Sequence, residues 1–118
     1  MNDLAHAQID RLEKKATLAA KTLKSLSNKW RLLILCRLVA GEMSVGELLE
    51  VVDLSQSALS QHLAVLRTSG LVTTRRESQS IFYSIKGSEV TIILAALYEA
   101  FCAPAAAKKA GRAKKAKA

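Results

Sequence analysis

The sequence predicts a small, mainly helical domain with one β-hairpin in its second half. Three observations support this fold class. The chain has 118 residues, 50% of them hydrophobic and 4% aromatic, which is enough for one core and too short for two independent ones. Apolar residues recur at helical spacing over most of the chain, and between residues 71 and 86 they give way to two β-branched and aromatic runs. Its 5 Gly and 1 Pro exclude collagen-like and Pro-rich classes.

The first two segments each predict a helix. The first is amphipathic, and its apolar stripe comprises Ile9, Leu12, Ala16, Ala19, Ala20 and Leu23. Ser27 and Asn28 then offer N-caps for a helix over residues 29–40, which Gly41 closes. Because this second segment is apolar on almost every side, we expect it to be buried from two directions.

A helix, a short turn and a second helix follow. Ser44 and Glu47 match the S-x-x-E capping box and predict a short helix that ends at Val52. Ser55 then caps a helix from Gln56 to about Thr68. This arrangement is a helix-turn-helix.

The remaining segments complete the domain. Residues 71–77 and 80–86 predict a two-stranded hairpin around a polar Ser-Gln turn. Ser88 is expected to cap a last helix that Pro104 ends. Its apolar stripe comprises Val90, Ile93, Leu94, Leu97 and Phe101. The order of elements predicts a winged helix-turn-helix with an extra helix at each end.

The net charge of +8 is concentrated at the C-terminal end. From Ala105 onward there are six basic residues and no acidic ones, so residues 1–104 have a net charge of only +2. We therefore expect residues 1–104 to form the domain and residues 105–118 to be a disordered, basic Ala/Lys tail. An arm that binds phosphates is a second interpretation of this tail, so DNA binding has to be argued from motifs in the domain.

The sequence predicts a cytoplasmic protein. No stretch reaches the roughly 18 apolar residues of a membrane span, and Met1–Arg11 is too polar for a signal peptide. Two cysteines cannot build a disulfide scaffold, so in a reducing compartment they indicate either inert packing or redox chemistry.

The second helix of the helix-turn-helix is a candidate DNA-reading helix. Leu59, Leu63 and Leu66 share its core face. The cap and five polar side chains of the helix are the candidate DNA contacts: Ser55, Gln56, Ser57, Ser60, Gln61 and His62. Short uncharged side chains approach base edges closely, and Gln can pair bidentately with adenine. For any one Ser an ordinary surface position is an equally good interpretation, and His62 also suits a half-buried, hydrogen-bonding role.

The hairpin carries the candidate backbone contacts. Arg75 and Arg76, with Lys86, supply positive charge where a wing would touch phosphates or the minor groove. Because successive residues of a strand point to opposite faces, at most one of the two arginines is expected to face the DNA.

These segments resemble a known family. Residues 43–48 (MSVGEL), 54–72 (LSQSALSQHLAVLRTSGLV) and 75–85 (RRESQSIFYSI) are similar to the ArsR/SmtB family of homodimeric bacterial transcription regulators, over roughly residues 23–102. The resemblance implies a homodimer built mainly from the first and last helices. Two DNA-reading helices about one DNA turn (~34 Å) apart would then select double-stranded DNA with an imperfect inverted repeat.

Many members of that family sense metals, but the matching ligands are absent here. Residues 47–54 lack a Cys-x-Cys, and residues 89–102 contain Glu89 and Glu99 but no His or Asp. One thiolate with scattered carboxylates would be a poor site for soft or borderline metals. We expect no metal and no cofactor, and a metal-sensing repressor with a non-standard site remains the alternative function.

The two cysteines are the remaining candidates for a sensor. Taken alone, Cys36 is interpreted as a small buried hydrophobe, and Cys102 is interpreted as a helix-end residue without a role. Their contexts, RLLILC and YEAFC, lie 66 positions apart and resemble the dithiol subgroup typified by HlyU, BigR and SqrR. This resemblance implies that Cys36 and Cys102 of one protomer react with low-molecular-weight persulfides or oxidants, forming a polysulfide bridge or a disulfide that changes operator affinity.

Two other classes of protein are less well supported. A thiol enzyme would need a Cys-x-x-Cys motif or a cysteine paired with a base, and neither is evident, so we expect no enzymatic activity. An architectural protein that used only its basic tail would bind random DNA as well as an inverted repeat.

Overall fold

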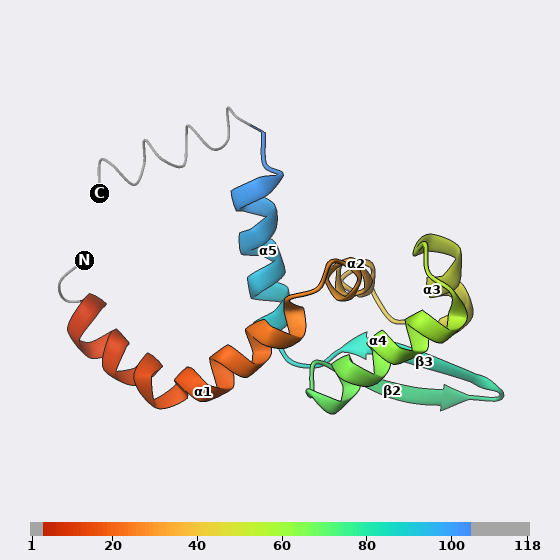
Figure 1. The fold of residues 1–118 in the computed structure, drawn as a ribbon, viewed down its shortest axis with the longest axis horizontal. Coiled ribbons are helices and arrows are strands. Elements are labelled where there is room, and N and C mark those ends of the chain that lie inside the picture. The colour runs from red at the N-terminus through yellow and green to blue at the C-terminus, as the bar shows by residue number, and fades with distance from the viewer. Residues whose placement is uncertain (1–3, 105–118) are drawn as a thin grey trace. The chain divides into compact units, whose positions relative to one another are not determined.

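The computed structural model describes residues 4–104 and divides into two compact units, with the boundary between Lys86 and Gly87. The first unit holds the helix-turn-helix and the sheet, and the second holds the last helix (Figure 1). The expected disordered tail, residues 105–118, lies outside the described residues. Within residues 4–104, no helix is long and apolar enough to cross a membrane.

The first unit begins with two helices. A short π-helical segment, η1 (Leu4–Gln8), leads into α1 (Ile9–Leu26), and α2 (Lys29–Leu38) follows. Asn28 caps α2, because its side-chain Oδ1 accepts the backbone N–H groups of Trp30 and Arg31 at 2.9 and 3.1 Å. The helix ends two residues before the predicted position, and Gly41 N–H donates to Leu38 O at 3.1 Å.

Residues 4–104 bury one side of helix α2 only. Ile34, Leu35 and Leu38 are buried, whereas Leu33 and Val39 are 42% and 49% exposed. The expectation of burial from two directions is therefore wrong for the described residues of one chain. An apolar composition on most sides of a helix indicates that the helix is buried. It does not show which of the helix faces are covered by residues of the same chain.

The sheet has one strand more than predicted. Strands β2 (Val72–Glu77) and β3 (Ser80–Ile85) form the expected hairpin. A two-residue strand, β1 (Met43–Ser44), also pairs with β3, giving the antiparallel order β1-β3-β2. Two residues are too few to show a strand period, so only the pairing across the fold reveals β1.

Helix α3 (Val45–Val51) begins directly after β1, and its capping box is present as predicted. The Ser44 side chain accepts Glu47 N–H at 3.1 Å, and the Glu47 carboxylate accepts Ser44 N–H at 2.9 Å. One pair of residues therefore ends a strand and starts a helix.

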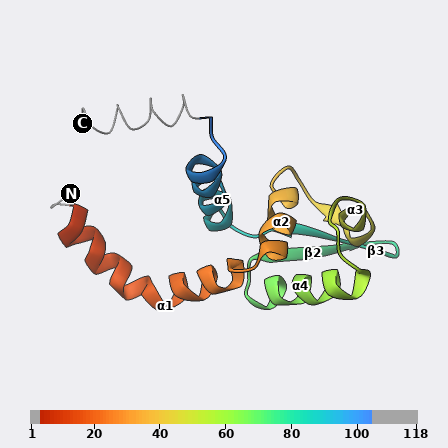
Figure 2. The same ribbon diagram turned by 45° about the horizontal axis from the view of Figure 1, so that its top comes forward.

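Helix α4 (Gln56–Thr68) has the predicted bounds. It runs beside the sheet in both views, and Leu59, Leu63 and Leu66 are buried in the core (Figures 1 and 2). Gly70 follows the C-cap Ser69, and its φ of +76° lies in the left-handed region that glycine adopts at low cost. Leu71 N–H then donates to Leu66 O at 2.9 Å, which closes the helix end.

The second unit contains α5 (Glu89–Phe101), which stops before Pro104 as expected. Val90 and Leu94 are buried, but Phe101, expected on the same stripe, is 78% exposed. Ser88 precedes the helix without capping it, because its side chain makes no cap hydrogen bond. Its backbone is already helical, with φ −101° and ψ −15°, whereas a capping side chain needs an extended backbone to reach the first N–H groups.

Candidate nucleic-acid interface

The start of α4 is held by a local hydrogen bond. Ser55 has extended backbone geometry, and its Oγ accepts Ala58 N–H at 3.1 Å. Leu59, the first core residue of the helix, is fully buried. The cap and the buried stripe together fix which residues of α4 face outward.

The outward face of α4 is mostly polar, and Arg67 in the last turn is its exposed charged residue. Its exposed residues include four predicted DNA contacts: Gln56, Ser57, Ser60 and Gln61. Among residues 4–104, none of these four side chains makes a hydrogen bond, so their donors and acceptors face solvent. Amide and hydroxyl groups held in this way on a rigid helix can distinguish the donors and acceptors of base edges.

A hollow lies beside this face. It has a volume of ≈ 530 Å³ and is bordered by α3, α4 and the hairpin. Polar residues on its walls include Ser44, Gln56, Ser60, Gln79 and Ser80. The hollow therefore connects the polar side chains at the start of α4 with those of the β2–β3 hairpin, which is the wing of this fold.

His62 occupies a different environment from the other polar residues of α4. It is half-buried, and its Nδ1 lies 3.5 Å from Arg31 Nη1 of α2. At this separation an N–H···N hydrogen bond is weak, and Nδ1 accepts it only in the neutral ring protonated on Nε2. The side chain thus contacts the neighbouring helix.

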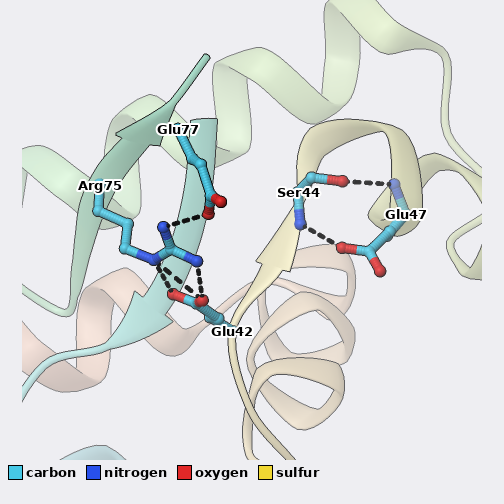
Figure 3. Close-up of polar contacts among 5 residues, drawn as sticks. All are labelled: Glu42, Ser44, Glu47, Arg75 and Glu77. Carbon is cyan, nitrogen blue, oxygen red and sulfur yellow. Dashed lines mark hydrogen bonds and ion pairs between the residues drawn. The ribbon is translucent and has the colours of Figure 1, made fainter. Parts of the chain in front are cut away.

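Arg75 is held by two carboxylates of the same chain. Its Nε donates to both oxygens of Glu42 at 2.8 and 2.9 Å, and its Nη1 donates to Glu77 Oε2 at 2.7 Å (Figure 3). Its guanidinium carbon also lies 4.6 Å from the centre of the Phe82 ring, the residue opposite it in the sheet. These contacts oppose the use of this guanidinium for DNA phosphates.

The same contacts shift two pKa values. Hydrogen bonding from Arg75 lowers the pKa of Glu42, and this effect outweighs the opposing effect of burial. Hydrogen bonds to Glu42 and Glu77 raise the pKa of Arg75. Sequence reasoning missed Glu42, because its role depends on β1, which carries the residue to the sheet.

Arg76 differs from its neighbour. It is exposed, and it makes no hydrogen bond or ion pair with any residue in the 4–104 range. The wing therefore presents one compensated and one uncompensated guanidinium, on adjacent residues of β2.

The two cysteines are both exposed. Cys36 lies on α2, and Cys102 follows the last residue of α5, where its N–H donates to Tyr98 O at 2.7 Å. The interpretation of Cys36 as a small buried hydrophobe is wrong, since the described residues leave Cys36 exposed. Across the described part of the chain, no group of three His, Cys, Asp or Glu residues could hold a metal ion.

The chain is similar to known bacterial regulatory proteins. Residues 28–74 match the model of the ArsR family of bacterial regulatory proteins. The chain is 46% identical over 98 residues to the transcriptional activator HlyU of Vibrio cholerae serotype O1, covering 83% of this chain and 91% of that protein.

Solved structures of such proteins share the fold. Reduced HlyU from Vibrio cholerae N16961 is 47% identical, with a TM-score of 0.73 over 79% of this chain and 98% of that one. The transcriptional repressor BigR from Xylella fastidiosa is 45% identical, with a TM-score of 0.76 over 80% of this chain and 97% of that one. The predicted winged helix-turn-helix is confirmed. So is the expectation of a non-enzyme, because the similar proteins are named as regulators of transcription.

Proposed function

The chain belongs to the ArsR family of bacterial regulatory proteins, a DNA-binding family of transcriptional regulators, and we propose that it acts as a redox-switched homodimer. In this proposal α4 reads an imperfect inverted repeat in duplex DNA. Reaction of Cys36 and Cys102 with persulfides or oxidants then changes the affinity for that DNA.

The polar outward face of α4 carries the proposal of sequence reading. We assign base-edge contacts to Gln56, Ser57, Ser60 and Gln61, with Ser55 at the helix start. A merely solvated helix face usually carries several Glu and Lys, whereas the exposed residues of α4 include a single charged side chain, Arg67. A rigid backbone matters here, because each good bidentate contact discriminates between bases by about 1–3 kcal/mol only when its geometry is held.

The wing supplies affinity that does not depend on sequence. We assign the phosphate contact to Arg76, whose charge no described residue compensates, and we assign Arg75 to holding the wing. One uncompensated guanidinium per subunit releases about one counterion on binding, so this contribution weakens as salt rises.

Exposed apolar side chains support the homodimer. Helix α1 exposes Ile9, Leu12, Leu18 and Leu23, each more than half exposed, and α5 exposes Ile92, Tyr98 and Phe101. Large apolar side chains gathered on one element are typical of a surface that a partner covers. We propose that a second copy of this chain covers them, which would bring two α4 helices to successive major grooves.

The exposure of both thiols supports the switch. Two thiols and one peroxide give a disulfide and two waters, the sulfurs losing two electrons and two protons. Two thiols and two molecules of glutathione persulfide give a trisulfide bridge, two glutathiones and one hydrogen sulfide. Because the cysteines belong to different compact units, either bridge would join those units covalently and bias the DNA-competent state.

Intact-mass spectrometry tests the thiol chemistry. The reduced protein is treated without oxygen with glutathione persulfide or with peroxide, alongside Cys36→Ser and Cys102→Ser. A mass change matching an internal bridge, seen in the wild type and in neither variant, is expected. Unreacted thiols, or an identical product in either variant, would contradict the dithiol switch.

A duplex selection tests the DNA proposal independently of the thiols. Reduced wild-type protein is used to enrich duplexes from a random library, and the enriched sequences are compared with the input. Enrichment of an imperfect inverted repeat is expected. Recovery of random duplexes alone would indicate binding through charge only and would refute sequence reading by α4.

A further inference from the structure

Ser25 is the one buried polar residue among residues 4–104, and it lies in the last turn of α1 at 7% exposure. Its Oγ donates to Ser69 Oγ at 2.7 Å, across 44 positions of sequence. Ser69 is the C-cap of α4. In both views the end of α1 lies beside the end of α4 (Figures 1 and 2).

Ser25 also takes part in a second hydrogen bond, through its backbone carbonyl. The backbone carbonyl of Ser25 accepts a hydrogen bond from Arg31 Nε at 2.6 Å. The Nη1 of the same guanidinium lies 3.5 Å from His62 Nδ1, in the middle of α4. Ser25 therefore connects to α4 at two places, directly at its C-terminal end and through Arg31 at its centre.

From this geometry we propose that Ser25 is a positioning residue that sets the orientation of α4 for sequence reading, with Arg31 and His62 as its second connection. This inference rests on the proposed function, because it assumes that α4 reads DNA. It assigns His62 to holding α4 in place, since its Nδ1 faces Arg31.

The contacts made by Ser25 and Arg31 restrict the directions in which α4 can move. The buried leucines of α4 hold the helix against the core, but apolar packing is non-directional and permits small rotations and slides. Hydrogen bonds are directional, so contacts at the centre and at the end of α4 oppose such movements. The outward side chains have to meet base edges to within fractions of an ångström, and nonspecific phosphate contacts tolerate more movement.

The test separates positioning from stability with four variants. Ser25→Ala and Ser69→Ala each leave one hydroxyl without its partner, whereas the double variant removes both. Thr22→Ala is the matched control, because Thr22 lies one turn earlier on α1 and its hydroxyl donates only to Leu18 O of the same helix. For each protein, urea unfolding is compared with affinity for a duplex selected by the wild type and for a random duplex of equal length.

Each single variant is expected to lose stability and to lower the preference for the selected duplex by about fivefold. The double variant should regain much of the stability, because losing both partners leaves less unpaired than losing one. Its preference should stay low, and Thr22→Ala should retain the wild-type preference. Preference that recovers together with stability, or that falls equally in Thr22→Ala, would overturn the proposal.

Hydrogen exchange without DNA distinguishes this inference from the function on which it rests. If the wild type does not prefer its selected duplex, sequence reading itself has failed. The positioning role is then judged by the backbone amides of Ser69, Gly70 and Leu71 at the end of α4. Faster exchange of these amides in Ser25→Ala than in Thr22→Ala supports the positioning of α4 by the Ser25–Ser69 hydrogen bond. Equal exchange in the two variants overturns it.

Discussion

Arg75 and Glu42 are 33 positions apart in the chain, yet the guanidinium Nε of one lies within 2.9 Å of both carboxylate oxygens of the other. The contact joins β2 to the segment before β1, with Glu77 as a second acceptor. Of two adjacent arginines that look equivalent in the sequence, one is compensated within the fold and the other faces solvent.

The salt dependence of DNA binding distinguishes the two arginines. Arg76→Gln should reduce the slope of log affinity against log salt by about 0.9 for each subunit that contacts DNA, because one fewer counterion is released. Arg75→Gln should leave the slope nearly unchanged. Binding of a selected duplex, followed by fluorescence anisotropy over a salt series, measures both. An equal reduction in the two variants would mean that DNA displaces Glu42 and Glu77 from Arg75.

The Glu42 carboxyl should titrate below its ordinary pKa of 4.5, because the Arg75 hydrogen bond favours the charged form. The stabilising effect of the pair is therefore fully present above pH 4.5 and is lost as pH falls through the lowered pKa. A carbon-detected NMR titration of the side-chain carboxyl gives the midpoint. In Arg75→Gln it should move back up toward 4.5. A midpoint unaffected by this substitution would contradict the contact in solution.

Truncation of a core leucine in α4 should destabilise the protein strongly. Leu59 is fully buried, so Leu59→Ala loses its transfer free energy and leaves a cavity, at a cost of about 2–5 kcal/mol. Val65 lies on the same helix at 40% exposure, and Val65→Ala should cost much less. Urea denaturation of the two variants measures the difference. Similar losses would show that Val65 is also covered, for example by a second copy of the chain.

The two predicted caps at Asn28 and Ser88 should respond differently to alanine. Asn28→Ala removes an acceptor used by two backbone N–H groups and should cost about 1 kcal/mol. Ser88→Ala removes a side chain without a cap hydrogen bond and should change stability by a few tenths at most. Thermal or urea unfolding provides the comparison. A large loss in Ser88→Ala would indicate that its hydroxyl caps α5 in solution.

The ends of several elements follow from residues that lie close together in the sequence. The Ser44–Glu47 capping box and the Ser55 cap act over three positions, so the starts of α3 and α4 could be predicted from the chain alone. The apolar spacing of α4 likewise identifies its buried leucines. These signals are reliable because each depends on contacts within one or two helical turns.

Features that depend on distant segments could not be predicted in the same way. The strand β1 is two residues long and exists only through its pairing with β3. The exposure of Cys36 depends on which faces of α2 the rest of the chain covers. The burial of Ser25 beside Ser69 likewise requires α1 and α4 to meet.

By itself, the sequence determined the order of the elements, the bounds of α4, its polar outward face and the family to which the chain belongs. Only the tertiary structure decided that Arg75 is compensated while Arg76 is exposed, and that Ser25 connects α1 to α4. The physical reason is the separation along the chain of the residues that make each contact. Caps and helical periods are set by neighbours along the chain, whereas an ion pair or a buried hydroxyl pair depends on how segments 33 or 44 positions apart approach each other.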